Sequence, residues 1–170
     1  VIAFPTDTFY GLGADPMNPR AVDRIYAIKT RPAHKPILVL IASLKQLDDF
    51  AAEISLEAKK LIWTFWPGPL TLLFKAKPHL PQNLTAGSGK IGIRLPANDF
   101  VLELIRRIGH PLTAPSANPS GSRNLSAAKE VMQALGDEVD LIIDGGQTHG
   151  TAASTVLDTT VHPPELLREG

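Results

Sequence analysis

Residues 1–13, VIAFPTDTFYGLG, combine an apolar strand run with a polar turn, and this combination indicates the fold class. Val1–Phe4 is a short apolar run typical of a buried strand, and the rigid polar turn Pro5-Thr6-Asp7-Thr8 follows it directly. Junctions of this kind between a strand and a loop are where α/β proteins usually hold ligands. Similar clusters occur at Thr30-Arg31-Pro32, Arg94-Leu95-Pro96 and Ala114–Gly121. Four such clusters in one small domain favour a binding site over ordinary turns.

The regions around these clusters predict a mixed α/β domain. Apolar runs rich in Ile, Val and Leu predict strands at Val1–Phe4, Ile37–Ala42, Leu70–Lys75, Ile91–Leu95, Leu112–Ala114, Leu141–Ile143 and Thr155–Leu157. Helices are predicted after the start signals Asn18-Pro19, Ser43, Ser55, Asn98 or Asp99, and Ser126. Stop signals follow three of them, at Pro67, Gly109 and Gly136.

Length and composition exclude several classes of protein. The 170 residues are 44% hydrophobic and 20% charged, which predicts one globular domain over residues 1–170 with its own core. The absence of cysteine excludes a disulfide scaffold and thiol catalysis, and is compatible with the cytoplasm. No run approaches the ~20 apolar residues of a membrane span. Because the chain begins in a strand without Met, we expect both ends to be trimmed.

Charge is patterned although the net charge is +0. This balance does not itself predict a nucleic-acid binder. Five cations and one carboxylate lie between Arg20 and Lys35, whereas residues 130–144 carry only acidic charges, and this asymmetry favours an anionic ligand on one side. Lys29 and Arg31 lie at a helix end that runs into Pro32, where cations complement the helix dipole and can also face a cleft.

Several known site motifs are absent. Gly87-Ser88-Gly89-Lys90 is not a Walker phosphate loop, because Leu84 and Ile91 occupy positions that require Gly and Ser or Thr. The five histidines show no metal-ligand spacing, so we expect no metal bound by the chain itself.

Eight motifs occur in one order along the chain. They are Phe4–Gly13, Ile28–Pro32 with Lys35-Pro36, Trp66–Thr71, Arg94-Leu95-Pro96, Ala114–Asn118, Asp144-Gly145-Gly146, Ser154-Thr155-Val156 and Leu167-Arg168. This set resembles the YrdC/Sua5 family, the threonylcarbamoyl-adenylate synthases, over nearly the whole chain. The pair Lys29-x-Arg31 and Ser116-x-Asn118 matches the family signature. Taken alone, most of these residues have ordinary structural explanations, such as turns or surface ion pairs, so the interpretation depends on their joint occurrence.

The resemblance implies a fold and an activity. The fold is a YrdC-like open, twisted, mixed α/β sheet with a concave, positively charged face, not a Rossmann-like topology. The activity is the synthesis of L-threonylcarbamoyl-adenylate and pyrophosphate from L-threonine, bicarbonate and ATP. The product serves the t⁶A modification at position 37 of tRNA, which implies the t⁶A transfer machinery as a downstream partner and a cytoplasmic location.

The resemblance also implies site residues. The implied catalytic residues are Lys29 and Arg31. The implied ATP-binding residues are Arg31, Lys35, Lys90, Ser116, Asn118, Asn124 and Arg168. The implied L-threonine site comprises Thr8, Arg94, the backbone near Ala114, and Ser154; the planar fork of Arg94 suits a carboxylate. Mg²⁺ is expected with the triphosphate, held mainly by phosphate oxygens and water.

Two alternatives remain open from the sequence. One is the carbamoyl-adenylate-forming YrdC-like domain of a hydrogenase-maturation carbamoyltransferase, which uses carbamoyl phosphate. The other is a module that binds double-stranded RNA or tRNA through its basic cluster without chemistry, and its affinity would fall steeply with salt.

Overall fold

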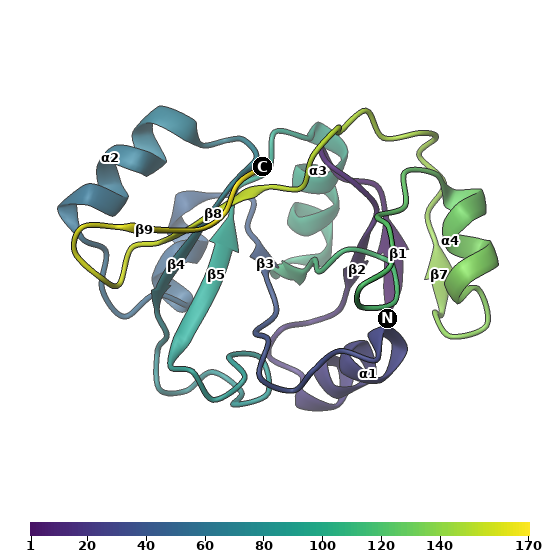
Figure 1. The fold of residues 1–170 in the computed structure, drawn as a ribbon, viewed down its shortest axis with the longest axis horizontal. Helices are drawn as coiled ribbons and strands as arrows, with labels where there is room; N and C mark the ends of the chain where they lie inside the picture. The colour runs from purple at the N-terminus through teal and green to yellow at the C-terminus, as the bar shows by residue number, and fades with distance from the viewer.

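The computed structural model describes all 170 residues and contains two mixed β-sheets with helices around them (Figure 1). The larger sheet has the strand order β6 (Leu112–Thr113), β3 (Val39–Leu40), β5 (Lys90–Arg94), β4 (Leu70–Lys75), β8 (Thr155–Asp158) and β9 (Glu165–Arg168). The smaller has the order β2 (Gly11–Gly13), β1 (Ile2–Phe4) and β7 (Leu141–Ile142). Parallel and antiparallel pairs occur in both sheets. The α/β class and mixed strand pairing are confirmed, but two sheets form where one was expected.

All seven predicted strands are present, and two further strands were missed. β2 was not predicted because the Gly-Leu-Gly sequence lacks β-branched residues; the strand forms by pairing antiparallel with β1. β9 was not predicted because all four of its residues are exposed at the edge of the larger sheet, so its sequence shows no alternation of buried and exposed residues. Strand β3 is shorter than predicted, although Ile41 beyond its end still donates a backbone hydrogen bond to Arg94.

Three of the predicted helices begin where their caps indicate. These are α1 (Pro19–Lys29), capped by Asn18; α2 (Leu56–Phe65), capped by Ser55; and α3 (Asp99–Ile108), capped by Asn98. Gly109 ends α3 with a φ of 85°, a left-handed conformation that favours glycine.

Two helix predictions need correction. The segment after Ser43 is a 3₁₀ helix, η1 (Leu44–Asp49), and the Ser43 side chain does not cap it. The last helix, α4 (Ala128–Leu135), begins later than the predicted Ser126. The Glu130 carboxylate folds back and accepts the backbone N–H groups of Ser126 at 2.8 Å and Ala127 at 3.3 Å, which is the glutamate half of a capping box, and no side chain caps the first turn of α4.

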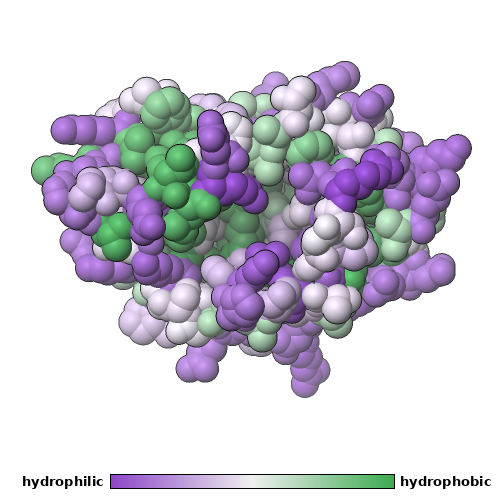
Figure 2. Space-filling view, viewed as in Figure 1, coloured by the Kyte–Doolittle hydropathy of each residue, from purple (hydrophilic) through white to green (hydrophobic).

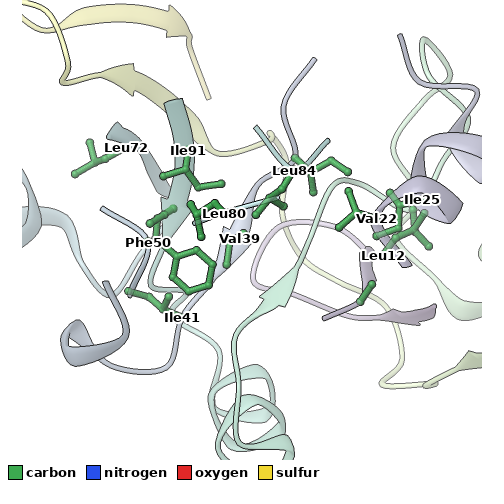
Figure 3. Close-up of a cluster of buried hydrophobic side chains, with 14 of the residues drawn as sticks. Leu12, Val22, Ile25, Val39, Ile41, Phe50, Leu72, Leu80, Leu84 and Ile91 are labelled. Atoms are coloured by element: carbon green, nitrogen blue, oxygen red, sulfur yellow. The ribbon is translucent and has the colours of Figure 1, made fainter. Parts of the chain in front are cut away.

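One continuous core of 28 buried residues joins the larger sheet to α1 and β2. Figure 3 shows part of it, from Leu72 and Ile91 on β4 and β5, past Val39, to Val22 and Ile25 on α1. A second cluster of six residues packs Val101 and Ile105 of α3 against strands of both sheets. None of the helices has the length and the apolar character that a membrane span requires.

Thr113 joins the two sheets. Its hydroxyl donates to the Leu12 carbonyl at 3.0 Å and accepts the Ala14 N–H at 2.9 Å, and its own backbone N–H donates to the Ala14 carbonyl. The side chain is fully buried, so no water is available to replace these partners. β6 of the larger sheet is thereby held beside β2 of the smaller one.

Replacing this hydroxyl is expected to destabilise the fold. Thr113→Val keeps the side-chain shape but leaves a buried carbonyl and a buried N–H without partners, which should lower the free energy of unfolding by about 2–4 kcal/mol. Urea denaturation measures the change. Thr64→Val, which removes an exposed hydroxyl from α2, is the matched control and should change stability by less than about 0.5 kcal/mol. Equal stability of the two variants would contradict the role given to Thr113.

Candidate functional site

A cleft of about 750 Å³ opens between the two sheets. It forms the hollow at the centre of the face seen in Figure 2, with apolar surface at its bottom. Its wall combines the loop between β1 and β2, the segment after α1, the loop after β6, and strands β4, β5, β8 and β9. Nine of the residues predicted for the site lie on this wall: Thr8, Arg31, Lys35, Arg94, Ala114, Ser116, Asn124, Ser154 and Arg168.

Three neighbouring strands provide the floor of the cleft. Leu72 of β4 pairs with Ile93 of β5, and Thr71 of β4 pairs with Val156 of β8. Side chains two residues apart share one face of a strand, so this register places Thr71, Arg94 and Ser154 together at one end of the floor.

Arg94 is a buried cation whose hydrogen-bonding capacity is not used up. Its side chain is almost completely inaccessible, and Nη1 lies 3.1 Å from Oδ1 of Asp7. Nevertheless Nε, Nη1 and the Asp7 oxygen lack hydrogen bonds of good geometry. Burial lowers the pKa of Arg94, while Asp7 opposes that shift. Buried donors without partners are rare in proteins, so this end of the cleft is suited to an anionic group.

Arg168 reaches the same end from the edge strand β9. Its Nε and Nη2 donate to the Ser154 carbonyl at 2.9 and 2.7 Å, and Nη2 also donates to Ser154 Oγ at 3.0 Å. Burial lowers the pKa of Arg168, and its charge in turn contributes to the lowered pKa of Arg94. Two guanidinium groups therefore lie near each other, which again favours an anionic ligand.

Arg31 and Lys35 line the other side, where the chain leaves α1. Thr30 ends the helix with a φ of 47°, so the chain turns sharply before Arg31. Arg31 then donates to the carbonyls of Lys35 at 3.0 Å and Pro36 at 2.9 Å, which fixes its guanidinium along this segment.

Lys29, one of the two implied catalytic residues, lies beneath the wall and not on it. It is only 2% exposed, and Nζ donates to the carbonyl of Ser116 and, at 2.6 Å, to that of Asn118. Burial, together with the nearby charge of Arg31, lowers the pKa of Lys29 to about 8. Its ammonium group therefore holds the backbone of the loop that carries Ser116.

Asn118 and Lys90 are the other predicted residues that do not line the cleft. Asn118 Nδ2 donates to the Ser122 carbonyl at 2.6 Å, so this side chain shapes the loop. Lys90 leaves β5 from the same face as Arg94 but pairs with Asp158 at 2.6 Å. Burial would raise the pKa of Asp158, but hydrogen bonds from Lys90 and Thr160 outweigh it and lower that pKa.

Several wall residues were missed by sequence reasoning. Thr6 accepts the Thr8 N–H at 3.1 Å and donates to the Phe9 carbonyl at 2.7 Å, so it shapes the turn that presents Thr8. Its place in the quoted polar cluster was the available signal. The apolar wall residues Ile37, Leu38, Leu73 and Val156 carried no signal beyond strand character. Thr71 ends the Trp66–Thr71 motif, which was not assigned to the site. Nowhere do three or more His, Asp or Glu side chains form a group that could hold a metal ion.

Comparisons with known proteins agree with this architecture. The family model Sua5/YciO/YrdC, described as telomere recombination, matches residues 1–170. A threonylcarbamoyl-AMP synthase of Pyrococcus abyssi is 44% identical over 170 residues, which are all of this chain and 50% of that protein. The crystal structure of P. abyssi Sua5 complexed with L-threonine has a TM-score of 0.95 at 44% identity, covering 98% of this chain and 49% of that one.

E. coli YciO has a TM-score of 0.90 at 30% identity, covering all of this chain and 82% of its own. The chain spans about half the length of the curated relatives from Pyrococcus abyssi and Bacillus subtilis that it matches at 44% identity. Its whole length nevertheless matches the family model, and its fold matches that of YciO. The chain therefore belongs to the Sua5/YciO/YrdC family.

Proposed function

We propose that this chain makes L-threonylcarbamoyl-adenylate and pyrophosphate from L-threonine, bicarbonate and ATP. The product would supply the t⁶A modification of tRNA. Threonylcarbamoyl-AMP synthases of Pyrococcus abyssi and Bacillus subtilis each match the whole of this chain at 44% identity, which supports the proposal.

The observation that carries the proposal is the buried side chain of Arg94 on the cleft floor, which has hydrogen-bond donors without partners. A buried guanidinium whose Nε and Nη1 donors lack hydrogen bonds of good geometry suits an anionic group such as an amino-acid carboxylate. Thr8 and Ser154 offer hydroxyls on the same wall, and the loop at Ala114 offers backbone groups. These residues would form the L-threonine site.

The nucleotide would occupy the part of the cleft near Arg31 and Lys35. Together with Arg168 these residues would give the concave face a positive charge, which suits a triphosphate. Ser116 and Asn124 would add hydrogen bonds, and the apolar wall around Ile37 and Leu38 would contact the base. Lys29 and Asn118 would act indirectly, by holding the loop of Ser116 in place.

The reaction needs positioning more than a strong base. The threonine nitrogen attacks the carbon of bicarbonate, water is lost, and a carbamate forms. A carbamate oxygen then attacks the α-phosphorus of ATP, and pyrophosphate leaves. Since the nucleophile is already anionic, the chain's task is to orient it and to offset phosphate charge. The wall presents cations and hydroxyls but no carboxylate, so Mg²⁺ would enter with the triphosphate and be held by phosphate oxygens and water.

Pyrophosphate release tests the proposal directly. The purified chain should release pyrophosphate from ATP only when L-threonine and bicarbonate are both present. Carbamoyl phosphate should not replace them. Release that requires carbamoyl phosphate instead would favour the hydrogenase-maturation alternative. Salt-sensitive RNA binding without any release would favour the RNA-binding module.

Arg94→Lys should affect threonine far more than ATP. Lysine keeps the charge but loses the planar fork, so the KM for L-threonine should rise about 10- to 100-fold while the KM for ATP changes less than about threefold. Steady-state kinetics with each substrate varied in turn measure both. Arg107→Ala, on the exposed face of α3, is the control and should change neither. Equal rises in both constants would discredit the carboxylate assignment.

Lys29→Met should weaken ATP use and remove a pH dependence of stability. Without the ammonium group the Ser116 and Asn118 carbonyls lose their partner, so the KM for ATP should rise about tenfold. The unfolded lysine keeps its proton up to its ordinary pKa of 10.5, above the folded value of about 8. Wild-type stability should therefore gain a contribution as pH rises from about 8 to 10.5.

Urea denaturation between about pH 8 and 10.5 measures the free energy of unfolding, and Lys29→Met should lack the gain in stability that the wild type shows with rising pH. Lys59→Met, which changes an exposed lysine on α2, should keep it. Identical pH profiles of wild type and Lys29→Met would remove the role given to the buried ammonium.

A further inference from the structure

The chain that leads from β7 to β8 passes over the turn between β1 and β2 (Figure 1). Residues 145–150 of this connection, which we call the strap, do not line the cleft. At the start of the strap, the hydroxyl of the fully buried Tyr10 donates to the Gly146 carbonyl at 2.7 Å. Further along, the Thr148 N–H donates to the Ser126 carbonyl at 2.7 Å. The strap is therefore fixed to two other parts of the molecule.

Two glycines bring the strap into contact with the turn. A Cβ atom at Gly150 would overlap the Thr8 carbonyl oxygen and lie 2.5 Å from the Thr8 Cα. A Cβ atom at Gly145 would lie 2.6 Å from Cγ of Pro5. Neither glycine has a positive φ, so these positions require the absence of a side chain and not a left-handed backbone. Because the backbone of Thr8 cannot rotate away, a larger residue at position 150 would force the strap and the turn apart.

The strap also leads to a second part of the proposed amino-acid site. After Gly150 the chain reaches the cleft wall at Ala153 and Ser154. Ser154 is held there, because Arg168 donates twice to its carbonyl, at 2.9 and 2.7 Å. Thr8, against which Gly150 packs, lines the cleft as well. The contact between Gly150 and Thr8 therefore connects the two hydroxyl residues that we assign to L-threonine.

We infer that Gly150 is a positioning residue that sets the spacing between Thr8 and Ser154, and thereby the width of the amino-acid end of the cleft. This inference rests on the proposed function for the identity of the amino acid. A side chain at position 150 has to displace either the Thr8 backbone or the strap that leads to Ser154, and both displacements alter the same spacing. Gly150 acts through the backbone, since it does not itself line the cleft.

The proposed nucleotide end of the cleft is independent of this contact. Arg31 and Lys35 lie on the segment after α1, which shares no hydrogen bond with the strap. A change at Gly150 should therefore affect the binding of the amino acid and leave the binding of ATP intact. A general loss of structure would weaken both.

The test is titration calorimetry with L-threonine alone and, separately, with ATP alone. Gly150→Ala should raise the Kd for L-threonine about 10-fold, and Gly150→Val should raise it further, because small displacements of binding groups are costly. The Kd for ATP should change less than about twofold in both variants. Gly109→Ala is the matched control, since Gly109 ends α3 with a φ of 85° and has open space around its Cα. It should lower Tm by about 2–4 °C and leave the Kd for L-threonine unchanged.

Tyr10→Phe tests the strap without adding any atom, and so covers the case in which Gly150→Ala does not fold. It removes only the hydroxyl that binds the Gly146 carbonyl and accepts the Gly145 N–H at 3.2 Å. The loosened strap should raise the Kd for L-threonine about 3- to 5-fold, again without an effect on ATP.

A double-mutant cycle tests whether Gly150 acts through Thr8. Gly150→Ala should lose most of its effect on the Kd for L-threonine in a Thr8→Ala background, whereas an unrelated structural effect would add in full. Additive losses would overturn the inference. So would equal rises in the Kd values for L-threonine and ATP, or a Kd for L-threonine that stays within twofold of wild type in both Gly150→Ala and Tyr10→Phe.

The failure of the proposed function would look different. A wild-type protein that binds L-threonine and shows the expected cycle, but releases no pyrophosphate with bicarbonate and ATP, would contradict the synthase activity and leave the role of Gly150 standing. Conversely, threonine-dependent release together with an unchanged Kd for L-threonine in Gly150→Ala would contradict the inference alone.

Discussion

The buried guanidinium of Arg94 is the interaction around which the cleft is organised. Transferring a charge from water into a protein interior is costly, and the nearby Asp7, whose carboxylate lies 3.1 Å away, offsets part of that cost. Two donors of Arg94, Nε and Nη1, remain without hydrogen bonds of good geometry, and Arg94 lines the cleft in which an anionic substrate would complete the compensation. The two sheets contribute one partner each, because Asp7 follows β1 and Arg94 ends β5. The relative placement of the sheets therefore determines the chemistry of the site.

A second buried cation is stabilised in a different way. Lys29 has no carboxylate partner, and its ammonium group is bound by backbone carbonyls of the loop after β6. Carbonyl oxygens offset less charge than a carboxylate does, and burial accordingly lowers the pKa of this lysine. Arg94 and Lys29 thus illustrate two uses of a buried positive charge. Arg94 keeps hydrogen-bond donors without partners, whereas the ammonium group of Lys29 is bound by the carbonyls of the loop that forms the wall.

Polar motifs and helix caps could be predicted from the sequence because they depend on interactions between neighbouring residues. Asn18, Ser55 and Asn98 cap the next residues in the chain, and their helices begin where the caps indicate. The α4 start was misjudged because Glu130, four residues beyond Ser126, supplies the capping oxygen. Strand β9 was missed because its hydrogen bonds to β8 form without any apolar pattern in its own residues. The β9 error thus arose from a partner in another strand, whereas the α4 error arose from a contact one turn ahead in the same segment.

The α/β class, the family and the polar clusters could be predicted from the residues alone, because strand runs, caps and turn residues act over a few neighbours and occur in one order. Three further features became visible only in the folded chain: the division into two sheets, the position of Lys29, Lys90 and Asn118 off the cleft wall, and the contact between Thr71 and Ser154. The reason is that a side chain's role depends on the atoms around it. Lys29 lies beside backbone carbonyls and Lys90 beside Asp158 because of strand register and burial, which no short stretch of sequence encodes.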